Sequence, residues 1–283
     1  MDKDINMEKL VSIILPTWKN AGEYINRSID SVIAQSNSNW ELLIIDDGLT
    51  DNTEEIVKEY IKKDRRIIFL KNEKNLGIQK TLNKGIKESK GEYIARIDDD
   101  DEWVDTDKLK KQVEFLNDNS GHVLVGTGVI VVNENGKELF RYLLPESDME
   151  IRNKILTKSC FIHSSIMFRK NVVVDLGGYD ESKETRHVED YDLWLKLGTV
   201  GKLVNLPTYA VKFTLRGGSI SSTNKLGQFK KNIILIKKYK NKYPNYFGAL
   251  IRAYVRIVVY GFILKLPIKF TLNKLTKFYK ENW

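Results

Sequence analysis

The stretch Gly91-Glu92-Tyr93-Ile94-Ala95-Arg96-Ile97-Asp98-Asp99-Asp100-Asp101 decides how the rest of the chain is interpreted. Residues Tyr93 to Ile97 predict a short buried strand, and four carboxylates follow where that strand ends and a loop begins. Adjacent acids repel one another, so water or a cation must neutralise them. Because alternate residues of an extended segment point the same way, Asp98 and Asp100 can bind one divalent cation together. The alternative is a solvated acidic loop that supplies charge to the start of the next helix.

Upstream of the aspartates, predicted strands and helices alternate over about a hundred residues. The predicted strands are 11–15, 40–45 and 67–70, and the predicted helices are 21–34, 53–61 and 79–88. This alternation predicts an α/β fold with a mostly parallel sheet and helices on both faces. Ligands of such sheets bind beyond the carboxyl ends of the strands. Both Asp46-Asp47 and the later aspartates fall at such ends, so we expect them to share one site.

Downstream of the aspartates, the pattern is less regular. The sequence predicts helices at 108–116, 148–156 and 189–197, and strands at 123–132, 137–142, 164–168, 202–206 and 210–215. Asn135-Gly136 predicts a hairpin turn between the strands 123–132 and 137–142. The sequence contains no internal repeat and no low-complexity tract.

Charge is distributed unevenly along the 283 residues. From Lys225 onward there are 14 lysines and arginines and one acid, Glu281, whereas the preceding residues hold 32 bases and 37 acids. This shift predicts a boundary between a globular part, 1–223, and a basic helical tail, 224–283. Cys160 is the only cysteine, so there is no disulfide framework, and we expect a reducing, cytoplasmic setting.

The tail predicts helices with both apolar and basic residues. Helix 226–239 has a basic face, and the apolar segment 249–266 is interrupted by three cations. Its longest uncharged run, 257–264, is far shorter than the roughly 20 residues of a spanning helix. We therefore expect residues 249–283 to lie on an anionic membrane surface. The alternative is a helical appendage packed on the globular part or on a second subunit. Nucleic acid is not an expected partner, because no recognition module is present.

Several motifs together resemble the family 2 glycosyltransferases with a GT-A fold, over about residues 10 to 222. The matching motifs are Val11 to Thr17, Glu41 to Gly48, Asn75-Leu76-Gly77, Leu82 to Ile86, Gly91 to Asp101, His163-Ser164-Ser165, Gly177 to Asp180, and Glu189 to Trp194. The resemblance implies a Rossmann-like nucleotide-binding half, about 10–101, followed by an acceptor half, about 102–223.

The resemblance implies a binding site for the nucleotide-sugar donor. Pro16 and Thr17 would line the nucleotide pocket. Asp47, with Asp46 beside it, would accept hydrogen bonds from the base and ribose, although a turn with capping acids also explains these residues. Lys80 either reaches a phosphate or is an ordinary surface lysine. A UDP-sugar is the favoured donor.

The resemblance also implies a diphosphate site with a metal ion. Asp98 and Asp100 would hold Mg²⁺ or Mn²⁺ across the diphosphate, with Asp99 among the substrate-binding residues. His163 either contacts the diphosphate or acceptor or is a structural histidine. Arg216 offers a cation to the diphosphate, but the sequence departs from the Arg-x-His that family members often carry there.

Asp190 matches the catalytic acid of the family, with Glu189 next to it. As a general base, Asp190 would take the proton of an acceptor hydroxyl while that oxygen attacks the anomeric carbon, and a single displacement inverts the configuration. The alternative for both acids is the favourable charge that they place at the start of a helix.

The sequence therefore predicts an inverting, metal-dependent hexosyl- or N-acetylhexosaminyl-transferase, attached peripherally to the inner face of the cell membrane. The expected acceptor is a lipid-linked or cell-surface glycan, as in bacterial surface-polysaccharide synthesis. The alternatives are a metal-dependent nucleotidyl transferase, a nucleotide-diphosphate hydrolase, or a non-catalytic module that binds nucleotide sugars. The oligomeric state is left open.

Overall fold

The computed structural model describes residues 9–19, 21–48, 51–216 and 225–263. In this part of the chain, a nine-stranded sheet has the order β3-β2-β1-β4-β8-β6-β9-β5, with β7 paired to β6. The N-terminal strands run parallel to one another and are β1 (Val11–Thr17), β2 (Trp40–Asp46), β3 (Ile67–Lys71) and β4 (Tyr93–Arg96). The four predicted strands and their parallel arrangement are therefore confirmed.

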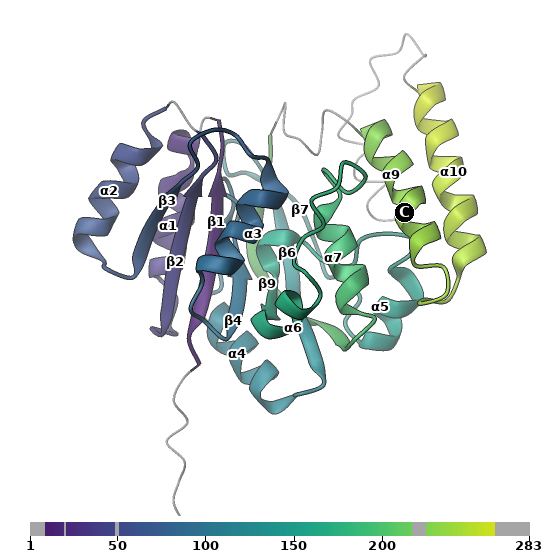
Figure 1. Cartoon of the computed structure of the whole chain (residues 1–283), viewed down its shortest axis with the longest axis horizontal. Coiled ribbons are helices and arrows are strands. Elements are labelled where there is room, and N and C mark those ends of the chain that lie inside the picture. Colours follow the sequence, from purple (N-terminus) through teal and green to yellow (C-terminus); the bar gives the residue numbers. More distant parts are fainter. Residues whose placement is uncertain (1–8, 20, 49–50, 217–224, 264–283) are drawn as a thin grey trace, which may run out of the picture.

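Helices bury both faces of the parallel strands (Figure 1). The 3-10 turn η1 (Ala21–Glu23) leads into α1 (Ile25–Ile33), and α2 (Thr53–Lys63) and α3 (Ile78–Glu88) follow. Alternate residues of β1 pack on opposite faces. Ile13 belongs to the buried cluster that contains α1 and α2 residues, whereas Ile14 belongs to the cluster that contains α3 residues. This two-sided burial explains why the strands are continuous apolar runs.

The second part of the sheet is mixed. β8 (Met167–Arg169) runs antiparallel to both β4 and β6 (His122–Asn133), and β9 (Lys202–Leu215) runs parallel to β6. Two shorter strands, β5 (Glu102–Trp103) and β7 (Glu138–Tyr142), pair antiparallel with β9 and β6. One continuous sheet therefore joins the parallel N-terminal strands to the mixed strands that follow Asp101.

β9 is a single strand where the sequence predicts two, 202–206 and 210–215. Its pairing with β6 shifts between Leu206 and Tyr209, so Pro207 lies in a bulge. Proline has no N–H to donate to a strand ladder, and a bulge accommodates it without ending the strand.

The predicted strand 164–168 is wrong at its start. The chain forms the 3-10 turn η2 (His163–Ser165) before β8 begins. The N–H and the Oγ of Ser165 both donate to the carbonyl of Ile162, at 2.9 and 2.8 Å. Such local bonds compete with a strand ladder.

Four helices complete the acceptor half. They are α4 (Lys108–Asp118), α5 (Asp148–Lys154), α6 (Lys170–Asp175) and α7 (Glu189–Leu197). The predicted helices correspond to α4, α5 and α7. The sequence analysis missed α6 and the two-residue strand β5, because both are too short to show a periodic pattern.

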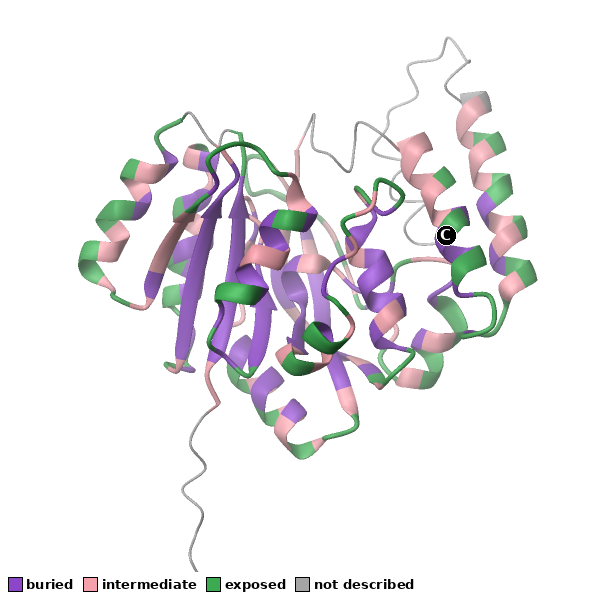
Figure 2. Ribbon diagram, viewed as in Figure 1, coloured by how far each residue is buried: buried purple, intermediate pink, exposed green. Residues whose placement is uncertain are grey.

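The helices α9 (Lys225–Lys238) and α10 (Tyr246–Ile263) lie at one end of the molecule (Figure 1). Ile236 of α9 and Ala253 of α10 belong to the same buried cluster as Leu193 of α7, and Figure 2 shows buried residues where these helices meet the rest of the protein. The predicted boundary at 223/224 and the predicted basic segment 269–280 lie outside the described residues. None of the described helices has the length and apolar character needed to cross a bilayer.

Candidate active site

Arg96, the last residue of β4, forms a two-pronged ion pair with Asp98. The Arg96 Nη1 and Nη2 atoms lie 2.8 and 2.6 Å from the two Asp98 carboxylate oxygens. Arg96 is buried. Burial lowers the pKa of its guanidinium, but Asp98 outweighs this effect and the net pKa is raised, so Arg96 is a fixed positive charge. The sequence analysis assigned no role to Arg96.

Residues of β9 and η2 form hydrogen bonds with Asp100 and Asp101. The Thr214 Oγ1 donates to the Asp100 carbonyl at 2.6 Å, and the Thr214 N–H donates to the Asp101 Oδ1 at 2.9 Å. The Ser164 Oγ donates to the Asp101 Oδ2 at 2.5 Å and accepts the N–H of Asp98 at 3.0 Å. Asp101 is thereby satisfied within the protein, whereas a ligand at Asp98 would share that carboxylate with Arg96.

Arg216, directly after β9, is the second cation of this cluster. Its Nε lies 2.6 Å from the Asp100 Oδ2, and its Nη2 lies 3.6 Å from the Asp99 Oδ1. Its guanidinium also lies 4.7 Å from the centroid of the Tyr24 ring. Arg216 was predicted to offer a cation to the diphosphate, and the structure places it beside the predicted metal-binding acids.

Four carboxylates and two guanidinium groups meet at the end of β4. Burial, followed by repulsion from Asp100 and Asp98, raises the pKa of Asp99 well above its usual range. The same causes, in the same order, raise the pKa of Asp101. Burial and then repulsion from Asp98 raise the pKa of Asp100. The raised pKa values favour the protonated forms of Asp99 and Asp101, and the two arginines lie opposite Asp98 and Asp100.

Asp47, after β2, organises the loop that precedes α3. Its carboxylate accepts the N–H of Leu76 at 2.8 Å, the N–H of Gly77 at 3.0 Å and the side-chain amide of Asn72 at 3.0 Å. These bonds use three of the roughly four acceptor positions of a carboxylate. Gly48 has φ +82°, and a Cβ atom there would lie 2.6 Å from the backbone N of residue 75, so the tight turn requires glycine.

The other predicted donor-site residues lie at neighbouring strand ends or on α3. Pro16 and Thr17 are buried at the end of β1, which lies between β2 and β4. Asp46 is buried opposite Thr17, and its Oδ2 lies 3.8 Å from the Lys71 Nζ. Lys80 is exposed on α3. Its contact with a phosphate stays a prediction.

Glu189 and Asp190 begin α7, as predicted. Burial, followed by repulsion from Asp190, raises the pKa of Glu189 to about 7. The Glu189 Oε2 is buried and accepts no hydrogen bond within the described residues. The Asp190 Oδ1 accepts the N–H of Tyr191 at 2.7 Å. The net pKa of Asp190 is raised. Burial is the main cause, the Tyr191 N–H and the charge of Arg96 oppose it, and the charge of Asp98 adds to it.

These electrostatic effects show that the two acidic groups are neighbours in space. The charge of Arg96 lowers the pKa of both Glu189 and Asp190, and the charge of Asp98 raises the pKa of Asp190. About 90 residues separate the two acidic groups in the sequence. The pKa of the Tyr179 hydroxyl depends on the same charges, which are those of Arg96, Asp190, Glu189 and Asp98. Arg96 thus acts electrostatically on the predicted metal-binding acid Asp98 and on the predicted base, Asp190.

His163 is held in place by aromatic neighbours. Its Nε2 lies 2.7 Å from the Tyr179 hydroxyl, and its ring packs edge-on against Trp194, with centroids 5.5 Å apart. Burial, and then the charge of Arg96, lower the pKa of His163 well below its usual range. His163 is therefore a neutral imidazole. These contacts fit the structural alternative, and a contact with substrate stays a prediction.

α9 fixes the position of α7. The Asp192 Oδ1, which is fully buried, accepts hydrogen bonds from the Lys238 Nζ at 2.9 Å and from the Tyr239 hydroxyl at 3.0 Å. The Lys231 Nζ donates to the carbonyls of Lys183 and Arg186, at 2.7 and 2.6 Å, in the loop before α7. The charge composition placed α9 in a separate tail and gave no sign of this support of α7.

A hard divalent cation fits the donor set at the end of β4. The available donors are carboxylate oxygens, which Mg²⁺ and Mn²⁺ prefer. Within the described residues, no group of three or more histidine, cysteine, aspartate or glutamate side chains is arranged so that it could hold a metal ion.

Comparison with known sequences identifies the family. The sequence profile of glycosyl transferase family 2 matches residues 12–177. The chain is 35% identical over 195 residues to the putative glycosyltransferase EpsE of Bacillus subtilis, covering 68% of each protein. It is 32% identical over 224 residues to WfgD of Escherichia coli, a UDP-Glc:α-D-GlcNAc-diphosphoundecaprenol β-1,3-glucosyltransferase, covering 78% of this chain and 83% of WfgD.

Comparison with solved structures identifies the fold. Staphylococcus aureus TarS 1–349 in complex with UDP-GlcNAc superposes with a TM-score of 0.70 at 22% identity, over 92% of this chain and 76% of that one. The mannosyltransferase PcManGT of Pyrobaculum calidifontis, in complex with GDP-Man and Mn²⁺, gives a TM-score of 0.66 at 16% identity, over 89% and 70%. The predicted GT-A fold is confirmed, and the chain belongs to glycosyl transferase family 2.

Proposed function

We propose that this protein is an inverting, metal-dependent glycosyltransferase that uses a nucleotide-sugar donor. The observation that carries the proposal is that Arg96, paired with Asp98, also acts electrostatically on Glu189 and Asp190. The group at the end of β4 suits the diphosphate end of a donor. The group at the start of α7 suits a general base that acts on an acceptor hydroxyl.

Asp190 is the proposed general base. Arg96 favours the ionised form of Asp190, whereas burial and the charge of Asp98 oppose that form. The net pKa of Asp190 is raised, so Asp190 is a stronger base than an exposed aspartate. Glu189 beside it keeps its proton more readily, with a pKa of about 7. A base and a protonated neighbour allow Asp190 to accept one proton without two adjacent negative charges.

Asp98 and Asp100 are the proposed metal-binding residues. When Mg²⁺ or Mn²⁺ is bound, it supplies positive charge that stabilises the departing nucleoside diphosphate. Arg216 contributes positive charge from β9, and Arg96 fixes the orientation of Asp98. Thr214 and Ser164 hold the backbone and side chains of the cluster, so the site is largely preorganised.

A UDP-sugar is the proposed donor and a lipid-linked or cell-surface glycan the proposed acceptor. WfgD, by its name, transfers glucose from UDP-Glc to a sugar on diphosphoundecaprenol, and TarS binds UDP-GlcNAc. We also propose that residues 249–283 attach the protein to the inner face of the membrane. In the described part of this segment, α10 exposes Ile251, Val255 and Val258, which supports the attachment.

Thermal unfolding with a panel of UDP-, GDP- and dTDP-sugars, with and without Mn²⁺, tests this function. A ligand that binds only the folded state raises the melting temperature. We expect stabilisation by one nucleotide family, dependent on Mn²⁺ and abolished by EDTA. Transfer of that sugar to lipid-linked acceptors, with determination of the anomeric configuration, then tests the reaction. Retention of configuration would overturn the inverting mechanism.

Two outcomes would favour the alternatives. Donor hydrolysis at the same rate with every acceptor and with none would indicate a diphosphate hydrolase. Metal-dependent donor binding without turnover on any acceptor would indicate a binding module. The variant Asp175→Asn is a suitable control throughout, because Asp175 is exposed on α6.

A further inference from the structure

The short turn η2 contacts the aspartates beyond β4 and the helix that carries the proposed base. The Ser164 Oγ donates to the Asp101 carboxylate and accepts the N–H of Asp98. The neighbouring His163 ring packs edge-on against Trp194 of α7. The position of η2 therefore affects the surroundings of both acidic groups.

Two buried side chains outside these groups hold the backbone of η2. The Trp103 Nε1–H donates to the carbonyl of Ser164 at 2.8 Å, and the Gln112 side-chain amide donates to the carbonyl of Ser165 at 2.9 Å. Trp103 is only 2% exposed, and Gln112 is fully buried. Their hydrogen bonds therefore act on the backbone of η2 and not on a substrate.

Lys108, the first residue of α4, contacts both of these side chains. Its Nζ donates to the Gln112 Oε1 at 2.9 Å and lies 3.9 Å from the centroid of the Trp103 ring. A lysine is almost never fully buried without a partner, and Lys108 is 1% exposed. Burial lowers the pKa of Lys108 well below its usual range, although the charge of Asp105 opposes this effect. A neutral amine still carries N–H groups, so the bond to Gln112 does not depend on protonation.

The contacts of Gln112 determine which way its amide faces. The oxygen and the nitrogen of an amide exchange places on a rotation of 180°. With its oxygen toward Lys108, Gln112 directs its NH₂ group toward the carbonyls of Ser165 and Val125, the second at 3.2 Å. The reversed amide would place an oxygen against two carbonyl oxygens. The amine and the two carbonyls therefore hold the amide in the one orientation that binds η2.

We propose that Trp103, Lys108 and Gln112 form one positioning unit that sets the place of η2 for the transfer reaction. By holding two carbonyls of η2, the unit keeps the Ser164 hydroxyl aligned with the aspartates beyond β4. The inference rests on the proposed glycosyltransferase function and extends it to residues that touch neither donor nor acceptor. Loss of the unit should weaken Mn²⁺-dependent donor binding and lower kcat, whereas a loss of stability alone changes neither in the folded enzyme.

Trp103→Phe is the main test, because it removes the indole N–H and keeps an aromatic ring beside Lys108. Changes to residues that orient metal ligands typically cost roughly 10- to 100-fold in metal affinity or activity. We expect Trp103→Phe to lower kcat and Mn²⁺-dependent donor affinity by about 10-fold each. Transfer rates and isothermal titration measure these values, and urea denaturation of the same preparations gives the folded fraction.

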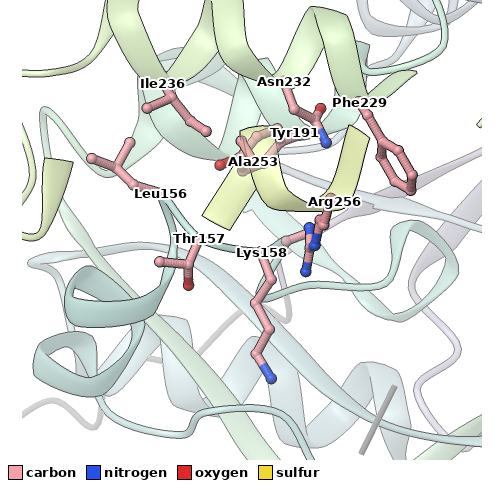
Figure 3. Close-up of a pocket in the computed structure, with 10 residues that line it drawn as sticks. Leu156, Thr157, Lys158, Tyr191, Phe229, Asn232, Ile236, Ala253 and Arg256 are labelled. Atoms are coloured by element: carbon pink, nitrogen blue, oxygen red, sulfur yellow. The ribbon is translucent and has the colours of Figure 1, made fainter. Parts of the chain in front are cut away.

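Trp40→Phe is the matched control. Trp40 is also 2% exposed, and the Arg66 guanidinium lies 3.7 Å from its ring centroid, but its Nε1 donates no hydrogen bond within the described residues. Trp40 begins β2, whereas the aspartates follow the end of the parallel strand β4. Ile236→Val, in the wall of the small cavity between α7, α9 and α10 (Figure 3), controls for loss of packing elsewhere. Both controls should bind the donor like the parent.

The imidazole NMR signal of His163 gives a readout that needs neither donor nor metal. The sequence has three histidines, so comparison with His163→Gln identifies the signal. Because His163 belongs to η2, its signal should shift in Lys108→Met, which removes the donor to Gln112 and leaves every aromatic ring in place. Lys110→Met, exposed on the same helix, should leave the signal unchanged.

Failure of this inference and failure of the proposed function give different results. Parental kcat and donor affinity in Trp103→Phe, equal losses in Trp40→Phe, or an unmoved His163 signal in Lys108→Met would overturn the positioning unit and leave an active parent a transferase. A parent that binds no donor with Mn²⁺ would overturn the proposed function, and the positioning role in transfer with it.

Discussion

The two acidic groups of the site are built in opposite ways. At the end of β4, Asp98 and Asp100 are each paired with an arginine, and Ser164 and Thr214 hold the surrounding groups. At the start of α7, Glu189 is buried with an oxygen that accepts no hydrogen bond within the described residues, and its pKa is about 7. At the end of β4, arginines balance the charges of Asp98 and Asp100. At the start of α7, Glu189 retains a proton near neutral pH.

This difference assigns the two groups different tasks. A balanced cluster of charged oxygens suits a cation and a diphosphate, because the charge is in place before the ligand arrives. A pair of carboxyl groups with raised pKa values suits proton transfer near neutral pH. Changing one member of each group should therefore have separable effects on binding and on turnover.

The largest expected effect is that of Asp190→Asn on turnover. An asparagine cannot accept the proton of the acceptor hydroxyl, so we expect kcat to fall by about 10²–10⁴-fold. Donor binding should be nearly unchanged, because the β4 group is intact. The measurement is transfer rate and Mn²⁺-dependent thermal shift on the same preparation. Turnover at the parental rate would show that Asp190 is not the base.

The second effect is that of Asp100→Asn, which should act on binding. Loss of one carboxylate from the proposed metal site removes a charged ligand, and we expect Mn²⁺-dependent donor affinity to weaken by about 10²-fold, or about 3 kcal/mol. Isothermal titration with the donor, with and without Mn²⁺, measures it. If Asp100→Asn and Asp190→Asn impaired donor binding equally, the division of tasks would be wrong.

The third effect concerns Glu189→Gln and stability. The pKa of Glu189 is about 7 in the folded protein and 4.5 ordinarily, so the unfolded chain releases this proton first as pH rises. The associated stability is complete below pH 4.5 and is lost as pH rises through 7. Glutamine cannot ionise, so at pH 8 the variant should be more stable than the parent by about 2–3 kcal/mol.

Urea denaturation of the parent and of Glu189→Gln at several pH values checks this prediction. The difference between them should shrink as the pH falls from 8 to 5, because the carboxyl of the folded parent becomes protonated and thereby regains most of the stability. A stability difference that does not change with pH would mean that Glu189 is not the group that holds the proton.

The smallest expected effect is that of Lys238→Met, which tests how firmly α7 is held. The substitution removes one partner of the buried Asp192 and should lower the free energy of unfolding by about 1–2 kcal/mol. The value is modest because 42% of the Lys238 side chain is exposed and water replaces part of the contact. Lys237→Met is the matched control, since Lys237 is exposed on the same turn. Equal denaturation midpoints for the two variants would contradict the role of Asp192.

The sequence predicted the parallel half of the fold and the acids of the site well. Strands such as 11–15 are continuous apolar runs because both of their faces are covered, and this pattern is local and easy to recognise. Asp98, Asp100 and Asp190 lie at element ends, where motif spacing and the ends of predicted elements coincide. That they act in one site stays a prediction.

The partners of these acids could not be predicted in the same way. Arg96 occupies a strand position that otherwise suggests an ordinary buried residue, and only the folded chain shows its pairing with Asp98. Thr214 meets Asp100 from more than a hundred positions away. The link between Asp192 and Lys238 is also tertiary, and charge composition alone assigned Lys238 to a separate tail. Local sequence patterns identify candidate acidic residues, but they do not identify the residues that neutralise and orient those acids.

The long strand β9 has a mechanical consequence. It begins shortly after α7, pairs with β6 along its length, and delivers Thr214 and Arg216 to the acids beyond β4. One strand that follows α7 therefore reaches the acids beyond β4 through an unbroken ladder, which ties the two ends of the described sheet together.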